Sequence, residues 1–242
     1  VIIACPDVNL VMYFVLALLC LALVGKVSAT YGVDLSTRTY SDSFSCMVSD
    51  GYTFTVVRVY QSSGHTDPNG AASINDAWAG GMSYVDGYIF PCYSCGNPAQ
   101  QMDDTIDYLA ANNVRLLKKG ETVESVRNET SVGATVGMIW LDIEGTDYWS
   151  TSASNNINFL QGMVDEGNAR GVVMGIYTSN SQWSPIMGGS TQFSQYPLWY
   201  AHYDNNPSFS DFVPFGGWTY PNIKQYAGTT SMCSASVDKS WY

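Results

Sequence analysis

Short apolar runs recur along this chain from residue 31 onward, and several are continuous instead of alternating with polar residues. A continuous apolar run of roughly four to eight residues is typical of a strand that is buried on both faces, as in a parallel sheet. These runs predict strands over Tyr31–Leu35, Phe54–Tyr60, Val85–Phe90, Val136–Ile143, Val172–Thr178, Leu198–Tyr203 and Ile223–Tyr226.

Helix-like segments lie between most of these runs. They cover Ala71–Met82, Asn97–Asn112, Ser152–Asn168 and Ser181–Met187. Strands that alternate with helices predict a parallel sheet or a barrel. The helical pattern fades after Leu198, so the last third of the chain is expected to be poor in helix. The segment Arg115–Gly133 fits either a short helix over Lys118–Arg127 or an exposed excursion.

The first thirty residues carry a different pattern. Val11 to Gly25 is almost wholly apolar, and Val27-Ser28-Ala29 supplies the small residues that a signal peptidase reads. The run is shorter than the about 20 residues of a membrane span. We expect residues 1–29 to be a leader with a signal peptide, of which residues 1–11, before Met12, lie outside the translated protein. Residues 30–242 are expected to form one domain, secreted or delivered to a lysosomal or phagosomal lumen, with no membrane attachment after cleavage.

Composition narrows the classes of function. The 242 residues are 46% hydrophobic and 13% charged, which describes a globular chain with a core and excludes a disordered one. The formal net charge is −11, with only 10 lysines and arginines, whereas nucleic-acid binders need clustered basic residues. We therefore expect no nucleic-acid partner. The chain has no internal repeat, which agrees with a single domain, and we expect a monomer.

Four cysteines remain once the leader is removed, namely Cys46, Cys92, Cys95 and Cys233. An even number in a secreted chain favours two disulfides, for which three pairings exist. The Cys92–Cys95 spacing also fits a redox pair or half of a zinc site, but the chain has only two histidines to complete such a site. We favour the pairs Cys92–Cys95 and Cys46–Cys233 and predict no metal. Asn128 begins a glycosylation sequon, usable if the chain is secreted.

The strongest local feature is Trp140-Leu141-Asp142-Ile143-Glu144-Gly145, at the end of an apolar run. Residues two apart in a strand face the same side, which places Asp142 and Glu144 together with Cα atoms roughly 6.6 Å apart. Two close carboxylates do not both ionise readily, so one pKa rises. Glycoside hydrolysis uses such a pair, one acid to protonate the leaving oxygen and one anion beside it. An exposed strand end or a cation site would also explain the pair.

Acids and aromatic residues stand at other expected strand ends. Asp34 stands near the end of Tyr31–Ser36, Asp204 follows Trp199–Tyr203, and Asp238 stands in Val237-Asp238. In a barrel of parallel strands, functional groups gather at the strand ends and converge on one cleft. Aromatic residues make up 14% of the chain, and rings suit both sugar stacking and core packing. Those at or near expected strand ends are Trp140, Tyr177, Trp199, Tyr200 and Trp218.

Seven short motifs follow one another from residue 32 to residue 238. They are Gly32-Val33-Asp34-Leu35-Ser36, Val57-Arg58-Val59-Tyr60 with Asp67, Leu141-Asp142-Ile143-Glu144, Gly175-Ile176-Tyr177-Thr178, Leu198-Trp199-Tyr200-Ala201, Lys224-Gln225-Tyr226 and Val237-Asp238. In this order they resemble glycoside hydrolase family 25, a family of muramidases. The cysteines, Phe90-Pro91-Cys92 and Phe215-Gly216-Gly217-Trp218 resemble its eukaryotic branch in nematodes and amoebae.

The resemblance implies a fold, a reaction and a set of residues. The fold is an α/β, flattened TIM-like (β/α) barrel whose last strands lack helices. The reaction is hydrolysis of the β-1,4 bond between N-acetylmuramic acid and N-acetylglucosamine in bacterial peptidoglycan, without a cofactor, for antibacterial defence or digestion. By position, Glu144 is the general acid, Asp142 its partner, which orients the acetamido group, and Asp34 and Asp238 line the cleft. The residues expected to bind substrate are Arg58, Tyr60, Trp140, Tyr177, Trp199, Tyr200, Asp204 and Gln225.

Two alternatives are compatible with a barrel of this kind. One is a catalytically inactive secreted glycan-binding protein, against which the presence of both Asp142 and Glu144 argues. The other is a chitinase-like N-acetylglucosaminidase, because family 18 chitinases also carry an acid-ended strand motif. That motif normally holds more acids in a longer run than Leu141-Asp142-Ile143-Glu144 does.

Overall fold

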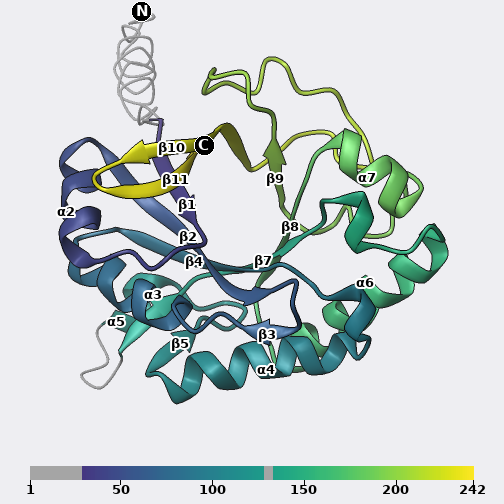
Figure 1. The fold of residues 1–242 in the computed structure, drawn as a ribbon, viewed down its shortest axis with the longest axis horizontal. Coiled ribbons are helices and arrows are strands. Elements are labelled where there is room, and N and C mark those ends of the chain that lie inside the picture. The colour runs from purple at the N-terminus through teal and green to yellow at the C-terminus, as the bar shows by residue number, and fades with distance from the viewer. Residues whose placement is uncertain (1–28, 128–132) are drawn as a thin grey trace, which may run out of the picture.

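The structure, a computed structural model, describes residues 29–127 and 133–242 (Figure 1). The predicted signal peptide and the Asn128 sequon lie outside the described residues and stay predictions. Within these two ranges, no helix is both long and apolar enough to cross a membrane.

Eight strands close a barrel. Around the ring they are β1 (Tyr31–Leu35), β11 (Ala235–Trp241), β10 (Ile223–Met232), β9 (Leu198–Ala201), β8 (Met174–Thr178), β7 (Ile139–Asp142), β4 (Tyr84–Ile89) and β2 (Tyr52–Gln61). Neighbouring strands are parallel except β11, which runs antiparallel to both β1 and β10. The barrel closes because β1 also pairs with β2. A two-residue strand, β3 (His65–Thr66), pairs antiparallel with the last two residues of β2, beyond the stretch that pairs with β1. The predicted barrel is confirmed.

Helices follow the first strands of the barrel and surround them on the outside (Figure 1). They are α2 (Ser41–Ser49) after β1, α3 (Gly70–Ala79) after β2, α4 (Pro98–Ala111) after β4, α6 (Ala153–Ala169) after β7 and α7 (Asn180–Met187) after β8. In the part of the chain that the structure describes, no helix follows Met187, so β9, β10 and β11 lack helices, as predicted.

Alternation along the strands separates two apolar layers. Leu141 and Ile176 belong to the large core between the barrel and its helices. Their neighbours Trp140 and Tyr177 pack with Trp199 in a second cluster. Gly175 makes this packing possible, because a Cβ atom there would lie 2.4 Å from the Trp140 ring. Trp140 and Asp142 share a strand face, so Asp142 points to the interior of the barrel.

The run predicted as one strand over Val136–Ile143 is divided in the structure. Its first part belongs to β6 (Ala134–Val136), which pairs with β5 (Val114–Leu116) in a separate two-stranded sheet. The break comes at Gly137, where a Cβ atom would lie 2.8 Å from a carboxylate oxygen of Asp86. Within the ambiguous segment, the helix α5 (Val123–Arg127) forms, which favours the short-helix alternative over an excursion.

Both predicted disulfides are present. Cys46–Cys233 joins α2 to the turn between β10 and β11, across a sequence separation of 187 residues. Cys92–Cys95 closes the short 3-10 helix η1 (Tyr93–Cys95), which follows β4. The turn at Cys233 and Ser234 has positive φ angles of 50° and 63°. The long bridge therefore fixes the hairpin of the last two strands against the first helix.

Candidate active site

Two adjoining hollows lie at the ends of β7, β8 and β9, and together we call them the cleft. The acidic hollow has a volume of about 60 Å³. Its lining consists of Asp34, Tyr88, Asp142, Glu144, Tyr177, Trp199, Tyr203, Gln225 and Asp238. The outer hollow has a volume of about 260 Å³ and shares Glu144, Tyr177 and Tyr203 with the first. The rest of its lining consists of Ser179, Ser181, Gln182, Ala201 and His202.

The four acids predicted as catalytic come together in the acidic hollow. Asp34 lies on β1 and faces Asp238 directly in the antiparallel β1–β11 pairing. Asp142 ends β7, and Glu144 follows two residues later. Asp238 therefore reaches the same place as the other acids although its strand runs in the opposite direction.

Gln225 holds this acidic cluster together. Its Nε2 donates to both carboxylate oxygens of Asp34 at 2.9 Å and to Asp238 Oδ2 at 3.3 Å. Its Oε1 accepts from the hydroxyls of Tyr177 at 2.6 Å and Tyr203 at 2.8 Å. One amide therefore fixes two acids on one side and two aromatic rings of the cleft wall on the other.

The buried acids favour their protonated forms. Burial raises the pKa of Asp34 well above its usual value, and the neighbouring charges of Asp238 and Glu144 act in the same direction. Burial also raises the pKa of Asp142 well above its usual value, followed by the charges of Glu144 and Asp34. The positive charge of Arg58 opposes this effect on Asp142. Because these carboxyls repel one another when ionised, the cluster retains protons at pH values where exposed carboxyls are charged.

Glu144 also has a raised pKa, first through burial and then through the charge of Asp238. Its backbone is held on both sides. Trp149 Nε1 donates to the Glu144 carbonyl at 3.0 Å, and the next peptide N–H, at Gly145, donates to Gln182 Oε1 at 2.9 Å. Gly145 adopts a φ of 68°, and a Cβ atom there would lie 2.7 Å from the ring of Tyr148. The backbone that carries Glu144 is thus fixed by specific contacts.

One carboxylate oxygen in the acidic hollow has no protein partner. Asp142 Oδ1 is buried and accepts no hydrogen bond from any residue in the described ranges. A buried polar atom without a partner is costly, and such atoms are rare in native proteins. A hydrogen-bond donor of a bound ligand, such as an amide N–H, would satisfy it.

Several residues predicted to bind substrate do not line either hollow. Arg58 donates through Nε to Asp67 Oδ2 at 2.7 Å and through Nη2 to the Ser36 carbonyl at 3.0 Å. Tyr60 is buried, and Trp140 Nε1 donates to Asp86 Oδ2 at 2.9 Å below the cleft. The predicted roles of these three in binding stay predictions. Tyr177, Trp199 and Gln225 do line the acidic hollow.

Asp204 and Tyr200 lie in another group, around the buried ammonium of Lys224. Lys224 Nζ donates to Asp204 Oδ2 at 2.8 Å, to Asp211 Oδ1 at 2.7 Å and to the Ser208 carbonyl at 3.0 Å. The hydroxyl of Tyr200 donates to Asp211 Oδ2 at 3.3 Å. We call this the Lys224 network. Asp204, expected in the cleft, instead anchors the loop after β9.

His202 extends the Lys224 network into the cleft, where it lines the outer hollow. Its Nδ1 lies 2.5 Å from Asp211 Oδ2 and 3.6 Å from Asp204 Oδ2. Among the described residues, His202, Asp204 and Asp211 form one of two groups whose spacing would suit a metal ion. The Lys224 ammonium already contacts both carboxylates, so this cluster is charge-compensated without one.

Sequence reasoning missed several residues that line the cleft. Tyr88 and Tyr203 line the acidic hollow, and Ser179, Ser181, Gln182 and His202 line the outer one. Tyr88 had a weak signal, because it is an aromatic residue near the end of the run predicted as a strand over Val85–Phe90. Gln182 had no such signal. It lies in the first turn of α7 and accepts a hydrogen bond from the backbone of Gly145, which follows a different strand, β7.

Comparisons with known proteins agree with this geometry. The family model described as lysozyme-like protein 1 matches residues 25–226. "Probable GH family 25 lysozyme 2" of Dictyostelium discoideum is 46% identical over 91% of this chain and 94% of that protein. "Lysozyme-like protein 5" of Caenorhabditis elegans is 32% identical over 95% of this chain and 98% of its own length.

The solved structure of a family GH25 lysozyme from Aspergillus fumigatus shares the fold. Its TM-score is 0.66, at 20% sequence identity, and the match covers 88% of this chain and 93% of that one. The family model, the two relatives and the closed barrel all lead to one assignment. The chain belongs to glycoside hydrolase family 25, in the lysozyme-like branch with amoeba and nematode members.

Proposed function

We propose that this protein is a lysozyme that hydrolyses the β-1,4 bond between N-acetylmuramic acid and N-acetylglucosamine in bacterial peptidoglycan. The observation that carries the proposal is a pair of groups at the end of β7. Asp142 Oδ1 is buried without a protein partner, and Glu144, two residues on, has a raised pKa. The names of the relatives as lysozymes support the same reaction.

Glu144 supplies the proton in the first step. Its raised pKa keeps the carboxyl protonated in mildly acid solution, where it donates to the glycosidic oxygen as the bond from the anomeric carbon breaks. The carbonyl oxygen of the substrate's own acetamido group attacks the anomeric carbon and forms a cyclic intermediate. Water then adds to that carbon as its bond to the acetamido oxygen breaks, and the water gives a proton to the Glu144 carboxylate, which restores both the acetamido group and the acid.

Asp142 orients the acetamido group for this attack. Its unpaired Oδ1 accepts the acetamido N–H, which turns the carbonyl oxygen toward the anomeric carbon. A hydrogen bond to the charged form of a carboxyl favours that form, so substrate binding promotes ionisation of Asp142. The new negative charge raises the pKa of Glu144 further and keeps its proton in place until transfer.

The two hollows receive the parts of the substrate on either side of the bond that is broken. The acidic hollow, at about 60 Å³, receives the acetamido group of the sugar whose bond is broken, because it contains Asp142. The outer hollow holds the leaving sugar on the other side of Glu144, and its hydroxyl and amide groups suit an uncharged sugar. Asp34 and Asp238, fixed by Gln225, line the same acidic hollow; the charge of Asp34 raises the pKa of Asp142, and the charge of Asp238 raises that of Glu144.

The protein acts in an oxidising, non-cytosolic compartment, either outside the cell or in a lysosomal or phagosomal lumen. Two disulfides support this location, because such bonds persist where thiols are not kept reduced. The apolar leader predicted as a signal peptide over residues 1–29 supports it as well.

A parallel assay tests the substrate. Purified peptidoglycan and chitin are incubated with the full protein, and new reducing ends are counted in both. We expect products from peptidoglycan, ending in N-acetylmuramic acid, and rates at least tenfold lower on chitin. Equal or faster release from chitin would assign the cleft to an N-acetylglucosaminidase, and no release from either polymer would leave only glycan binding.

A further inference from the structure

A third hollow lies outside the cleft, between η1 and the first two turns of α6. Its volume is about 460 Å³, and it is open to solvent. Tyr93, Ser94, Asn155, Asn158 and Phe159 line it. Because η1 follows β4 and α6 follows β7, this side hollow opens at the same end of the barrel as the cleft.

The lining of the side hollow combines rings with free amides. The rings of Tyr93 and Phe159 contact each other with centroids 5.3 Å apart. Asn155 and Asn158 stand three residues apart, so their exposed side chains share one face of α6. Within residues 29–127 and 133–242, the structure pairs neither side-chain amide nor the Tyr93 hydroxyl with another protein group. Aromatic surface beside amide donors and acceptors suits an N-acetylated sugar.

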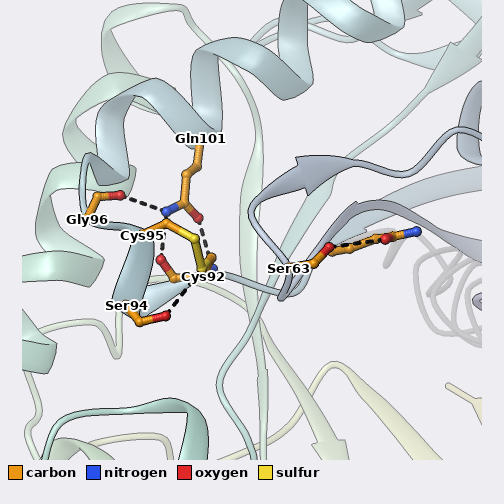
Figure 2. Close-up of a disulfide and its surroundings, with 7 residues drawn as sticks. Ser63, Cys92, Ser94, Cys95, Gly96 and Gln101 are labelled. Carbon is orange, nitrogen blue, oxygen red and sulfur yellow. Dashed lines mark hydrogen bonds between the residues drawn. A yellow bond between two sulfur atoms is a disulfide. The ribbon is translucent and has the colours of Figure 1, made fainter.

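A rigid wall faces these amides across the hollow. Cys92–Cys95 closes η1, and the buried Gln101 braces it from behind (Figure 2). Gln101 Oε1 accepts from the Cys92 N–H at 3.0 Å, and its Nε2 donates to the carbonyls of Cys92 and Gly96 at 2.8 Å each. A wall held in one shape loses little freedom on binding.

The turn between β2 and β3 packs against the same disulfide. A Cβ atom on Gly64 would lie 2.5 Å from Cys95 Sγ. A disulfide that spans three residues constrains the unfolded chain far less than one that spans 187. Its main contribution is therefore the local shape of η1, which forms one side of the hollow.

Trp149 connects the side hollow to the catalytic loop. Its ring packs on Tyr93 and Phe159, with centroids 6.1 Å and 6.0 Å apart, and its Nε1 donates to the Glu144 carbonyl. A single side chain thus separates the floor of the hollow from the loop that carries Glu144.

We propose that the side hollow is an accessory binding site for an N-acetylated glycan chain, which it holds on the enzyme while the cleft acts on the polymer. The Tyr93 ring stacks on a sugar face, and Asn155 and Asn158 exchange hydrogen bonds with an acetamido group. This inference rests on the proposed function for its polymer, but binding at the hollow is measured without any turnover.

The direct test is a titration of the full protein with tri-N-acetylchitotriose, followed by NMR of the side-chain amides. We expect the Asn155 and Asn158 amide signals to shift with saturation, and the Asn155→Ala/Asn158→Ala variant to lose this binding event. Asn206→Ala, an exposed asparagine outside all three hollows, is the matched control and should bind like the parent. Signals of both amides that stay unchanged throughout the titration would overturn the proposal.

The functional test compares two substrates. The double variant should bind purified peptidoglycan sacculi about tenfold more weakly in co-sedimentation, while its turnover of a short soluble glycan stays within about twofold of the parent. Unchanged sacculus binding would refute the accessory site. A parent that binds through these amides but cleaves no glycan would refute the proposed reaction and leave the site standing.

Discussion

Replacement of Lys224 by Met tests how the wall of the cleft is anchored. The ammonium is fully buried and contacts Asp204, Asp211 and the Ser208 carbonyl. Removing one partner of a buried ion pair costs about 3–5 kcal/mol, because the other charge stays behind without compensation. Asp204 and Asp211 keep 24% and 18% of their side-chain surface exposed, so water replaces part of the lost contact. We expect the lower end, about 3 kcal/mol at pH 7.

The loss should depend on pH in a defined direction. Burial tends to raise the pKa of Asp204 and Asp211, but the hydrogen bonds from Lys224 outweigh it, and both pKa values are lowered. Carboxyls with a lowered folded-state pKa stabilise the protein above their unfolded pKa of about 3.9, and this stability is lost as pH falls through the folded value. The difference between parent and variant should therefore shrink below about pH 4.

Urea unfolding of parent and variant at several pH values is the assay. Lys119→Met is the matched control, because Lys119 is exposed and its ammonium makes a single hydrogen bond, to Asn168 at 2.9 Å; the substitution should cost less than about 1 kcal/mol. Adding Asp204→Asn to Lys224→Met should recover part of the loss, since it removes one orphaned charge. A Lys224→Met protein within 1 kcal/mol of the parent at pH 7 would refute the anchoring role.

Three further predictions concern the cleft and the disulfides. On a short uncharged glycan, turnover should peak in mildly acid solution and fall as pH rises through the raised pKa of Glu144; a pH-rate profile with an optimum above pH 8 would contradict this. Asp142→Asn should abolish most activity yet stabilise the fold at pH 7, because a buried carboxyl with a raised folded-state pKa destabilises the protein as pH rises and the group ionises. Urea unfolding should show this gain in stability at pH 7 but not at pH 4. An equal difference between parent and variant at both pH values would count against the buried charge. Loss of Cys46–Cys233 through paired Ser substitutions should lower the unfolding free energy by up to about 5 kcal/mol, and loss of Cys92–Cys95 should lower it by about 2 kcal/mol. A larger loss for Cys92–Cys95 than for Cys46–Cys233 would contradict the loop-length argument.

The barrel could be predicted from the sequence because its strands are buried on both faces. The run Tyr31–Leu35 coincides with β1, since both faces of that strand are covered and nearly every residue is apolar. The hairpin strand β11 could not be predicted from its pattern, because Ala235–Trp241 mixes small, polar and apolar residues without a continuous apolar run. Strand β10 likewise extends beyond Tyr226 through residues that carry no strand pattern.

Asp34, Asp142 and Glu144 could be predicted because each stands at or beside the end of a parallel strand, whereas Asp238 lies in the middle of β11 and joins them through its antiparallel pairing with Asp34. The roles of Gln225 and Lys224 could not be predicted, although they are neighbours on β10. Their side chains point to opposite faces, so Gln225 reaches the acids inside and Lys224 reaches the loop outside. The partners of Lys224, Asp204 and Asp211, come from an irregular loop whose path no local pattern specifies.

The general-acid role of Glu144 is the central claim, and leaving-group dependence tests it most directly. Glu144→Gln keeps the size of the side chain but removes the proton, and Glu166→Gln on α6 is the matched control. On peptidoglycan, Glu144→Gln turnover should fall by at least about 10²-fold. On an aryl glycoside of the same sugar, whose phenolate leaves without a proton, the loss should be at least tenfold smaller. Equal losses on both substrates, or turnover of peptidoglycan within a few-fold of the parent, would contradict the account.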